Sequence, residues 1–211
     1  MQSWKIMAAI FIIAIALSIY FYPYPSMPEK MASHWNAEGK VNGYMSKNVA
    51  LFLIPFVILL LSLLFIAIPK IDPLKANIEN FRKYYDGFVI LFLAFMLSLH
   101  LQIILWNIGI KVPFNIFIPP WIAILFFYVG ILLENARQNW FVGIRTPWTL
   151  SNRIVWEKTH RLGGKLFKIA AIVALIGIIF PRYTIWFILL PVFASASYLV
   201  AYSYFEYQKI S

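Results

Sequence analysis

The residues with the most evident chemistry lie between Asn139 and Lys165, where the chain reads NWFVGIRTPWTLSNRIVWEKTHRLGGK. Arg145 carries a planar guanidinium that binds a carboxylate or a phosphate through two parallel hydrogen bonds. His160 is a candidate general acid or base, because the imidazole of an unperturbed histidine changes its charge near neutral pH. The stretch predicts an anion-binding site, and an interfacial or intramembrane hydrolase built on Arg145 and His160 is one alternative function.

The spacing within this stretch predicts an ordered turn followed by an interfacial helix. Gly143 permits backbone angles that other residues avoid, and Pro147 restricts Thr146 to extended backbone. Three residues are candidates for the N-cap of the helix: Thr149, Ser151 and Asn152. Gly163 and Gly164 are expected to break or bend the chain before the next segment.

The composition decides which elements must position these residues. Hydrophobic residues make up 62% of the 211 residues, charged residues only 12%, and the mean hydropathy is +0.78. A soluble domain of this size would not tolerate such a surface, so the chain is predicted to be an integral membrane protein. The absence of cysteine excludes disulfides and thiolate chemistry.

Uncharged runs long enough to cross a bilayer of about 30 Å predict six transmembrane helices. The expected spans are 6–26, 48–68, 87–108, 118–134, 163–180 and 183–205. We expect one all-α membrane domain over residues 1–211, with a structured outer loop at 25–47 and the inner stretch at 135–165. Each of the two long inner loops is expected to hold a short interfacial helix.

The distribution of Lys and Arg predicts the orientation of the bundle in the membrane. Thirteen of the 18 cations fall on one side: Lys5, Lys70, Lys75, Arg82, Lys83, Arg137, Arg145, Arg153, Lys158, Arg161, Lys165, Lys168 and Lys209. The other side has five: Lys30, Lys40, Lys47, Lys111 and Arg182. Both termini and the inner stretch are therefore expected in the cytoplasm, facing anionic lipids, and no direct nucleic-acid partner is expected because no nucleic-acid motif organises the cations.

Two further histidines are candidate functional groups. His34, in the outer loop, is a candidate toxin contact or metal ligand, and turn stabilisation is the simpler interpretation. His100 falls near the middle of the third span, with Gln102 and Asn107 nearby, and a hydrogen bond between helices is its expected role. A small-solute or ion transporter that depends on His100 is a second alternative, although no acidic residue lies in the middle of a span.

Local motifs of known enzymes are absent from the sequence, which contains no HExxH, GxSxG or glycine-rich phosphate loop. We therefore lean against an enzyme and expect no cofactor and no metal. Ordinary anchoring by aromatic and cationic residues at the inner leaflet is the competing interpretation for most single residues of the inner stretch.

The stretch NWFVGIRTPWTLSNRIVWEKTHRLGGKLF resembles the signature of the SdpI family of multi-pass membrane proteins, and YPSMPEKMASHWNAEGKVNGYMSK resembles the outer-loop motif found N-terminal to it. The resemblance implies a binding or signalling role for matching inner residues: Asn139, Arg145, Thr146, Pro147, Trp148, Thr149, Ser151, Trp156, His160 and Arg161. In the outer motif it points to His34, Trp35, Asn36 and Gly39. The family implies a cell-membrane protein that gives immunity to, or senses, a secreted peptide toxin and relays to a cytoplasmic regulator.

Overall fold

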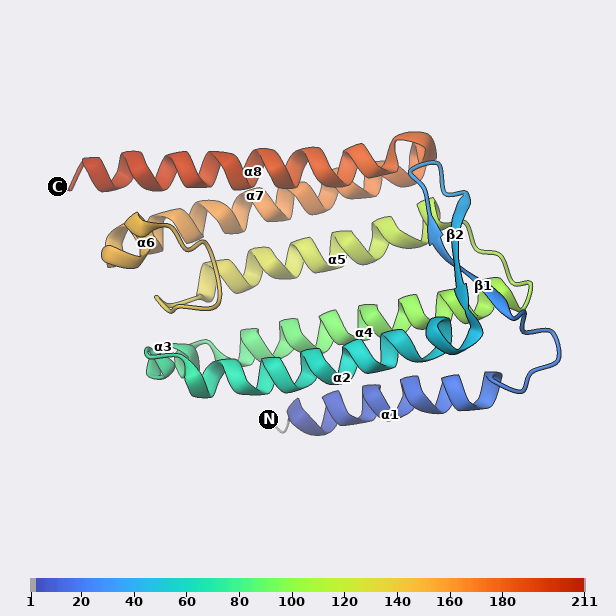
Figure 1. Ribbon diagram of the computed structural model, residues 1–211. Coiled ribbons are helices and arrows are strands. Elements are labelled where there is room, and N and C mark those ends of the chain that lie inside the picture. Colours follow the sequence, from blue (N-terminus) through green and yellow to red (C-terminus); the bar gives the residue numbers. More distant parts are fainter. Residues whose placement is uncertain (1–2, 211) are drawn as a thin grey trace.

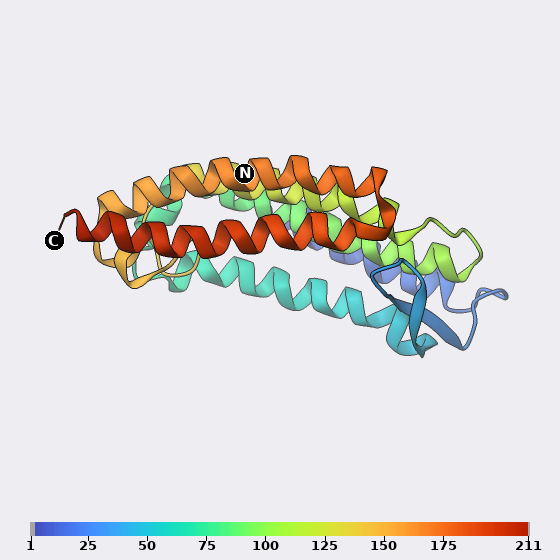
Figure 2. The same cartoon turned by 90° about the horizontal axis from the view of Figure 1, so that it is seen from above.

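The computed structural model describes residues 3–210 and contains six helices that are long and apolar enough to cross a membrane. They are α1 (Ser3–Phe21), α2 (Lys47–Ile71), α4 (Arg82–Asn107), α5 (Phe114–Asn135), α7 (Arg153–Ile179) and α8 (Thr184–Gln208). They run nearly parallel to one long axis (Figures 1 and 2). The protein is thus a multi-pass membrane protein with a six-helix bundle.

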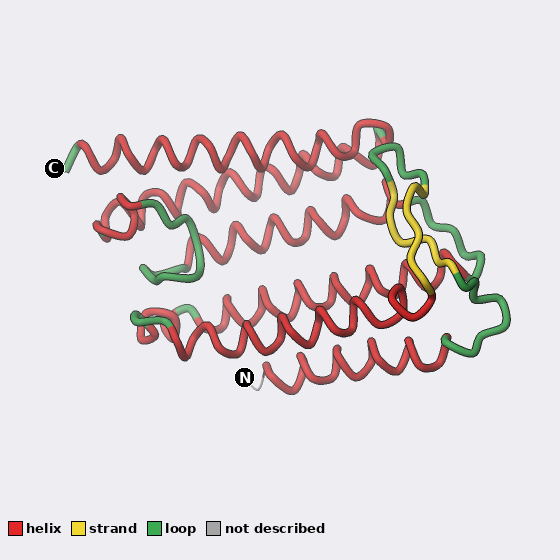
Figure 3. The backbone as a smooth tube through the Cα atoms, viewed as in Figure 1, coloured by secondary structure: helices red, strands yellow, loops and turns green. Residues whose placement is uncertain are grey.

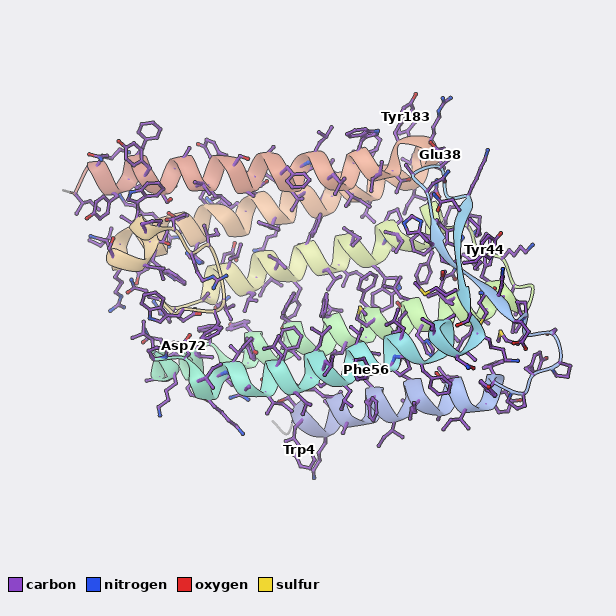
Figure 4. The ribbon with its side chains drawn as sticks, in the orientation of Figure 1. Trp4, Glu38, Tyr44, Phe56, Asp72 and Tyr183 are labelled. Atoms are coloured by element: carbon purple, nitrogen blue, oxygen red, sulfur yellow. The ribbon has the colours of Figure 1, made fainter. Side chains whose placement is uncertain are left out.

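The surface of the bundle is apolar, as a protein dissolved in lipid requires. Large hydrophobic side chains such as Ile19, Leu63, Ile172 and Phe193 are exposed along the helices. Figure 4 labels two more exposed hydrophobic residues, Trp4 on α1 and Phe56 on α2. Because every helix satisfies its own backbone hydrogen bonds, these apolar faces can contact acyl chains directly.

The six helices form two groups of three (Figure 1). In the first half, α1, α2 and α4 share a core that includes Met7, Ala14, Ile58, Val89 and Leu93. In the second half, small residues allow α5, α7 and α8 to pack closely, and the core is Ala123, Ala171, Ala174 and Ile188. The two halves meet along α4 and α5.

Helix α7 differs from the sequence-based expectation. It begins at Arg153 and continues through Gly163 and Gly164 without a break, so the predicted hinge and the separate interfacial helix from Arg153 are wrong. The glycines serve helix packing, since a Cβ at Gly164 would lie 2.8 Å from the carbonyl oxygen of Gly130 in α5. Glycine at this point lets two helices approach rather than bending one of them.

Short elements occupy the inner end of the bundle, the end that the cation count assigns to the cytoplasm. They are the helices α3 (Lys75–Asn80) and α6 (Pro147–Ser151), and both chain ends point to the same side (Figure 1). The interfacial helix expected in the first inner loop is α3. In the second inner loop, α6 is the only short helix among the described residues.

The outer end carries a β-hairpin that the sequence did not predict (Figure 3). Strands β1 (Lys30–Trp35) and β2 (Val41–Ser46) pair antiparallel, with Met31 opposite Met45. Strand β1 lies against the helices, whereas β2 faces outward. The 3-10 turn η1 (Pro181–Tyr183) joins α7 to α8 at the same end.

Candidate functional site

The inner stretch is organised by one buried side chain, Asn139, which is 0% exposed. Its Nδ2 donates to the carbonyl oxygens of Arg137 and Val142, at 2.8 and 2.9 Å. Its Oδ1 accepts from the backbone N–H groups of Phe141 and Val142, at 2.9 and 2.6 Å. Four hydrogen bonds from one amide therefore close the turn that follows α5.

This turn is attached to the first half of the bundle. Asp72, buried at the end of α2, accepts from the N–H of Trp140 at 2.9 Å and from the N–H of Leu74 at 2.6 Å. Asn77 of α3 donates to the carbonyl oxygen of Gln138 at 2.7 Å. Figure 4 labels Asp72 at this end of the molecule. The inner stretch thus connects the two halves where their helices end.

Helix α6 begins with a reciprocal cap. Thr146 Oγ1 accepts from the N–H of Thr149, and Thr149 Oγ1 accepts from the N–H of Thr146 at 2.9 Å. Pro147 occupies the first turn, where its missing N–H is no loss. Thr146 also shares a 3.0 Å hydrogen bond with Ser203 of α8. The expected ordered turn is confirmed, and it is tied to the last helix.

His160 is buried and fully engaged. Its Nε2 accepts from the N–H of Ile144 at 3.0 Å, which leaves the proton on Nδ1, and Nδ1 lies 2.9 Å from the carbonyl oxygen of Trp156. Its ring stacks on Trp156, with centroids 3.9 Å apart. Gly143 has a φ of +114°, and a Cβ there would overlap His160. With both nitrogens occupied, the geometry gives no support to His160 as a general base in a hydrolase.

Four predicted site residues of the inner stretch are exposed at the surface: Arg145, Pro147, Ser151 and Arg161, whereas Trp148 is half-buried. Arg145 donates from Nη1 to the carbonyl oxygen of Trp140 at 2.6 Å. Trp148 packs edge to face against Tyr204 of α8, with ring centroids 5.1 Å apart. Within residues 3–210, neither Arg145 nor Arg161 forms a salt bridge. The exposed members of this group are accessible to a cytoplasmic or lipid ligand.

Four residues whose side chains hold the inner stretch in place were not among the predicted site residues: Asp72, Asn77, Gln138 and Ser203. No local pattern could identify the role of Asp72, because its partner Trp140 is distant in the chain. Gln138 donates from Nε2 to the carbonyl oxygen of Leu150 at 2.5 Å. Ser203 sits in an otherwise ordinary apolar helix, so no local pattern could identify it as the partner of Thr146.

In the outer motif, Asn36 and Gly39 build the hairpin turn. Asn36 Oδ1 accepts from the N–H groups of Glu38 and Lys40, at 3.1 and 2.9 Å. Gly39 has a φ of +75°, and a Cβ there would overlap Asn115 of α5. The turn therefore lies directly against the second half of the bundle.

Trp35 and β1 join the hairpin to both halves. The Trp35 ring stacks on Phe114 of α5 at 4.9 Å and meets Trp106 of α4 edge to face at 5.4 Å. Asn107 of α4 binds the backbone of Ala32 as a neighbouring strand would, accepting from its N–H at 2.8 Å and donating to its carbonyl oxygen at 2.9 Å. The hairpin is a second connection between the halves, at the outer end.

His34 and His100 both have local partners. His34 is exposed and donates from Nδ1 to Asn42 Oδ1 at 2.6 Å, which is the turn-stabilising role. His100 lies 3.0 Å from Ser18 of α1 through Nε2, and Ser18 in turn donates to the carbonyl oxygen of Leu51 at 2.6 Å. The expected hydrogen bond between helices is present, although the partner is Ser18 and not a residue near His100 in sequence. Within residues 3–210, no three His, Asp or Glu side chains gather as metal ligands.

Comparison with known proteins agrees with this geometry. Residues 135–204, which contain the whole inner stretch, match the model of the SdpI/YfhL protein family. Residues 9–59, which contain the outer hairpin, match a domain of unknown function, DUF1648.

A curated relative covers nearly the whole chain. The protein is 26% identical over 195 residues to the immunity protein SdpI of Bacillus subtilis (strain 168), which is 92% of this chain and 90% of the relative. No solved structure matches. The family match over residues 135–204 and the similarity along most of the chain agree with each other, and both support the SdpI family.

Proposed function

We propose that this protein protects the membrane in which it resides against a membrane-active peptide toxin. The observation that carries the proposal is the similarity to an immunity protein along 92% of the chain, which includes both the outer hairpin and the inner stretch. The proposed toxin is an apolar peptide that acts on the cell membrane.

The outer hairpin is the part of the molecule that supports a toxin contact. Strand β2 turns its side chains away from the bundle, and Tyr44 is 64% exposed beside exposed Met45. A two-stranded sheet also leaves edges at which an extended peptide adds a strand through backbone hydrogen bonds. An apolar peptide that reaches the membrane from outside would meet this face first.

The outer hairpin and the inner stretch each connect the two halves of the bundle. This arrangement supports the proposal that a toxin bound at the outer end changes the structure at the inner end. The hairpin contacts α4 and α5 through Trp35, and the inner stretch joins the end of α2 to α7 and α8. A peptide that shifts one half relative to the other would therefore change both connections. We propose that the exposed residues Arg145 and Arg161, with half-buried Trp148 beside them, present this change to a cytoplasmic regulator.

The test is survival of a toxin-sensitive bacterium challenged with a membrane-active peptide toxin. The strains express the wild type, Tyr44→Ala, Arg145→Ala, or the control Tyr183→Ala, which removes another exposed outer tyrosine outside the hairpin. Figure 4 labels both tyrosines at the outer end. Membrane levels are equalised by blotting. We expect protection by the wild type and Tyr183→Ala, and reduced protection by Tyr44→Ala and Arg145→Ala.

The outcomes separate the parts of the proposal. Absence of protection by the wild type at equal membrane level contradicts the immunity function. Full protection by Tyr44→Ala contradicts the hairpin as the contact surface. Full protection by Arg145→Ala would mean that Arg145 only anchors the inner stretch to the membrane.

A further inference from the structure

A groove lies between the two halves near the inner end of the bundle, with a volume of about 320 Å³. Phe65 and Phe88 of the first half face Val129 and Phe167 of the second half across it. The loop Phe141–Ile144 of the inner stretch closes its cytoplasmic end. Its volume is at the lower limit of about 300 Å³ for ligand pockets in proteins.

The lining of the groove is unsuited to water. In the described part of the chain, Tyr85 is the only lining residue with a polar side chain, and its hydroxyl already donates to the carbonyl oxygen of Phe65 at 2.8 Å. A water molecule needs two to four polar partners, and the lining of this groove is mostly apolar. An empty apolar groove would forfeit dispersion contacts along its walls, so hydrocarbon is the favoured filling.

The groove is accessible from the lipid. Phe141 is 38% exposed, and Phe65, Phe88, Val129 and Phe167 are only partly buried. The groove therefore reaches the surface of the bundle at the depth of the cytoplasmic leaflet. An acyl chain from that leaflet has a direct route into it.

A cation stands beside the cytoplasmic end of the groove. Arg145 follows the lining residue Ile144, and its Nη1 is held on the carbonyl oxygen of Trp140, next to the lining residue Phe141. Within residues 3–210 this is the only hydrogen bond of the guanidinium, and no carboxylate pairs with it. The remaining N–H groups suit a phosphate, which a guanidinium binds through two parallel hydrogen bonds.

We propose that the groove holds one acyl chain of an anionic phospholipid of the cytoplasmic leaflet, with the phosphate of that lipid bound by Arg145. Charge complementarity selects this occupant, because the groove accounts for the chain and the unpaired guanidinium accounts for the anionic headgroup. This site does not depend on the toxin or on the proposed immunity function. It gives Arg145 a ligand that comes from the cytoplasmic leaflet itself.

Native mass spectrometry of the purified, delipidated protein tests the site. The probes are phosphatidylglycerol and phosphatidylcholine with identical acyl chains, added separately at increasing concentration. We expect one phosphatidylglycerol to be retained per protein, with at least tenfold weaker retention of phosphatidylcholine.

Variants then test the acyl-chain groove and the phosphate contact separately. Val129→Trp fills the groove and should abolish retention, and Val129→Phe is a smaller filling variant if the first does not fold. Arg145→Ala should weaken binding of phosphatidylglycerol about tenfold. The control is Arg182→Ala, which removes an exposed arginine at the opposite end of the bundle and should leave binding unchanged.

Four results would overturn the proposal. Three of them are equal retention of the two lipids, binding of phosphatidylglycerol that survives a folded groove-filling variant at Val129, and binding that is the same in Arg145→Ala and wild type. Equal losses in Arg145→Ala and Arg182→Ala would also overturn it, because the effect would then follow net charge and not this position.

Discussion

Replacement of Asn139 by alanine should loosen the inner stretch more than any other asparagine substitution within it. The four hydrogen bonds of the buried amide satisfy two N–H groups and two carbonyl oxygens of the turn. With a net contribution of about 1 kcal/mol for each bond, Asn139→Ala should lower the free energy of opening of the turn by about 4 kcal/mol.

Asn152→Ala is the matched control. Asn152 lies in the same stretch and accepts from two N–H groups as the N-cap of α7, at 2.8 and 3.2 Å, but it is only partly buried. Loss of such a cap costs about 1 kcal/mol. The difference of about 3 kcal/mol corresponds to roughly a 100-fold difference in the population of the opened turn.

The assay is cleavage by trypsin after Arg145 in inverted membrane vesicles, in which the cytoplasmic face is accessible. When opening is fast relative to cleavage, the cleavage rate follows the population of the opened turn. We expect Asn139→Ala to be cleaved at least tenfold faster than Asn152→Ala. Equal rates for the two variants would refute the conclusion that the Asn139 amide holds the turn together.

Two further predictions concern close contacts of the buried histidines. Gly143→Ala should prevent the hydrogen bond between His160 and the loop and lower the thermal midpoint of unfolding in detergent, because the added Cβ overlaps the imidazole. Gly109→Ala is the control, since Gly109 has a similar positive φ but open space around it. The thermal midpoint of Gly109→Ala should fall much less. A smaller or equal fall for Gly143→Ala would contradict the contact. Ser18→Ala and His100→Leu should show a coupling energy of about 0.6 to 2 kcal/mol in a double-mutant cycle of unfolding in SDS, because each removes the partner of the other. Additive effects would mean that the hydrogen bond contributes no stability.

The ordered turn and its caps were predictable from local sequence. Pro147 and Thr146 define the start of α6, and Asn152 is the N-cap of α7, because capping uses residues within three positions of one another. The stacking of Trp156 on His160 likewise follows from helical spacing. In contrast, the continuation of α7 through Gly163 depends on helix packing. The glycine pair considered without that packing led to the wrong prediction of a hinge.

Local patterns were sufficient for the class of protein, the number of spans, the end of the bundle that carries most of the cations and the resemblance to the family. These properties depend on composition and on patterns within about 20 residues, which is the length of one span. The tertiary structure decided the roles of the individual site residues. It buried Asn139 and His160 as structural supports, left Arg145 free at the end of an apolar groove, and connected the halves through Asp72 and Trp35. Those roles depend on contacts between residues far apart in the chain, and only the packing of the two halves creates them.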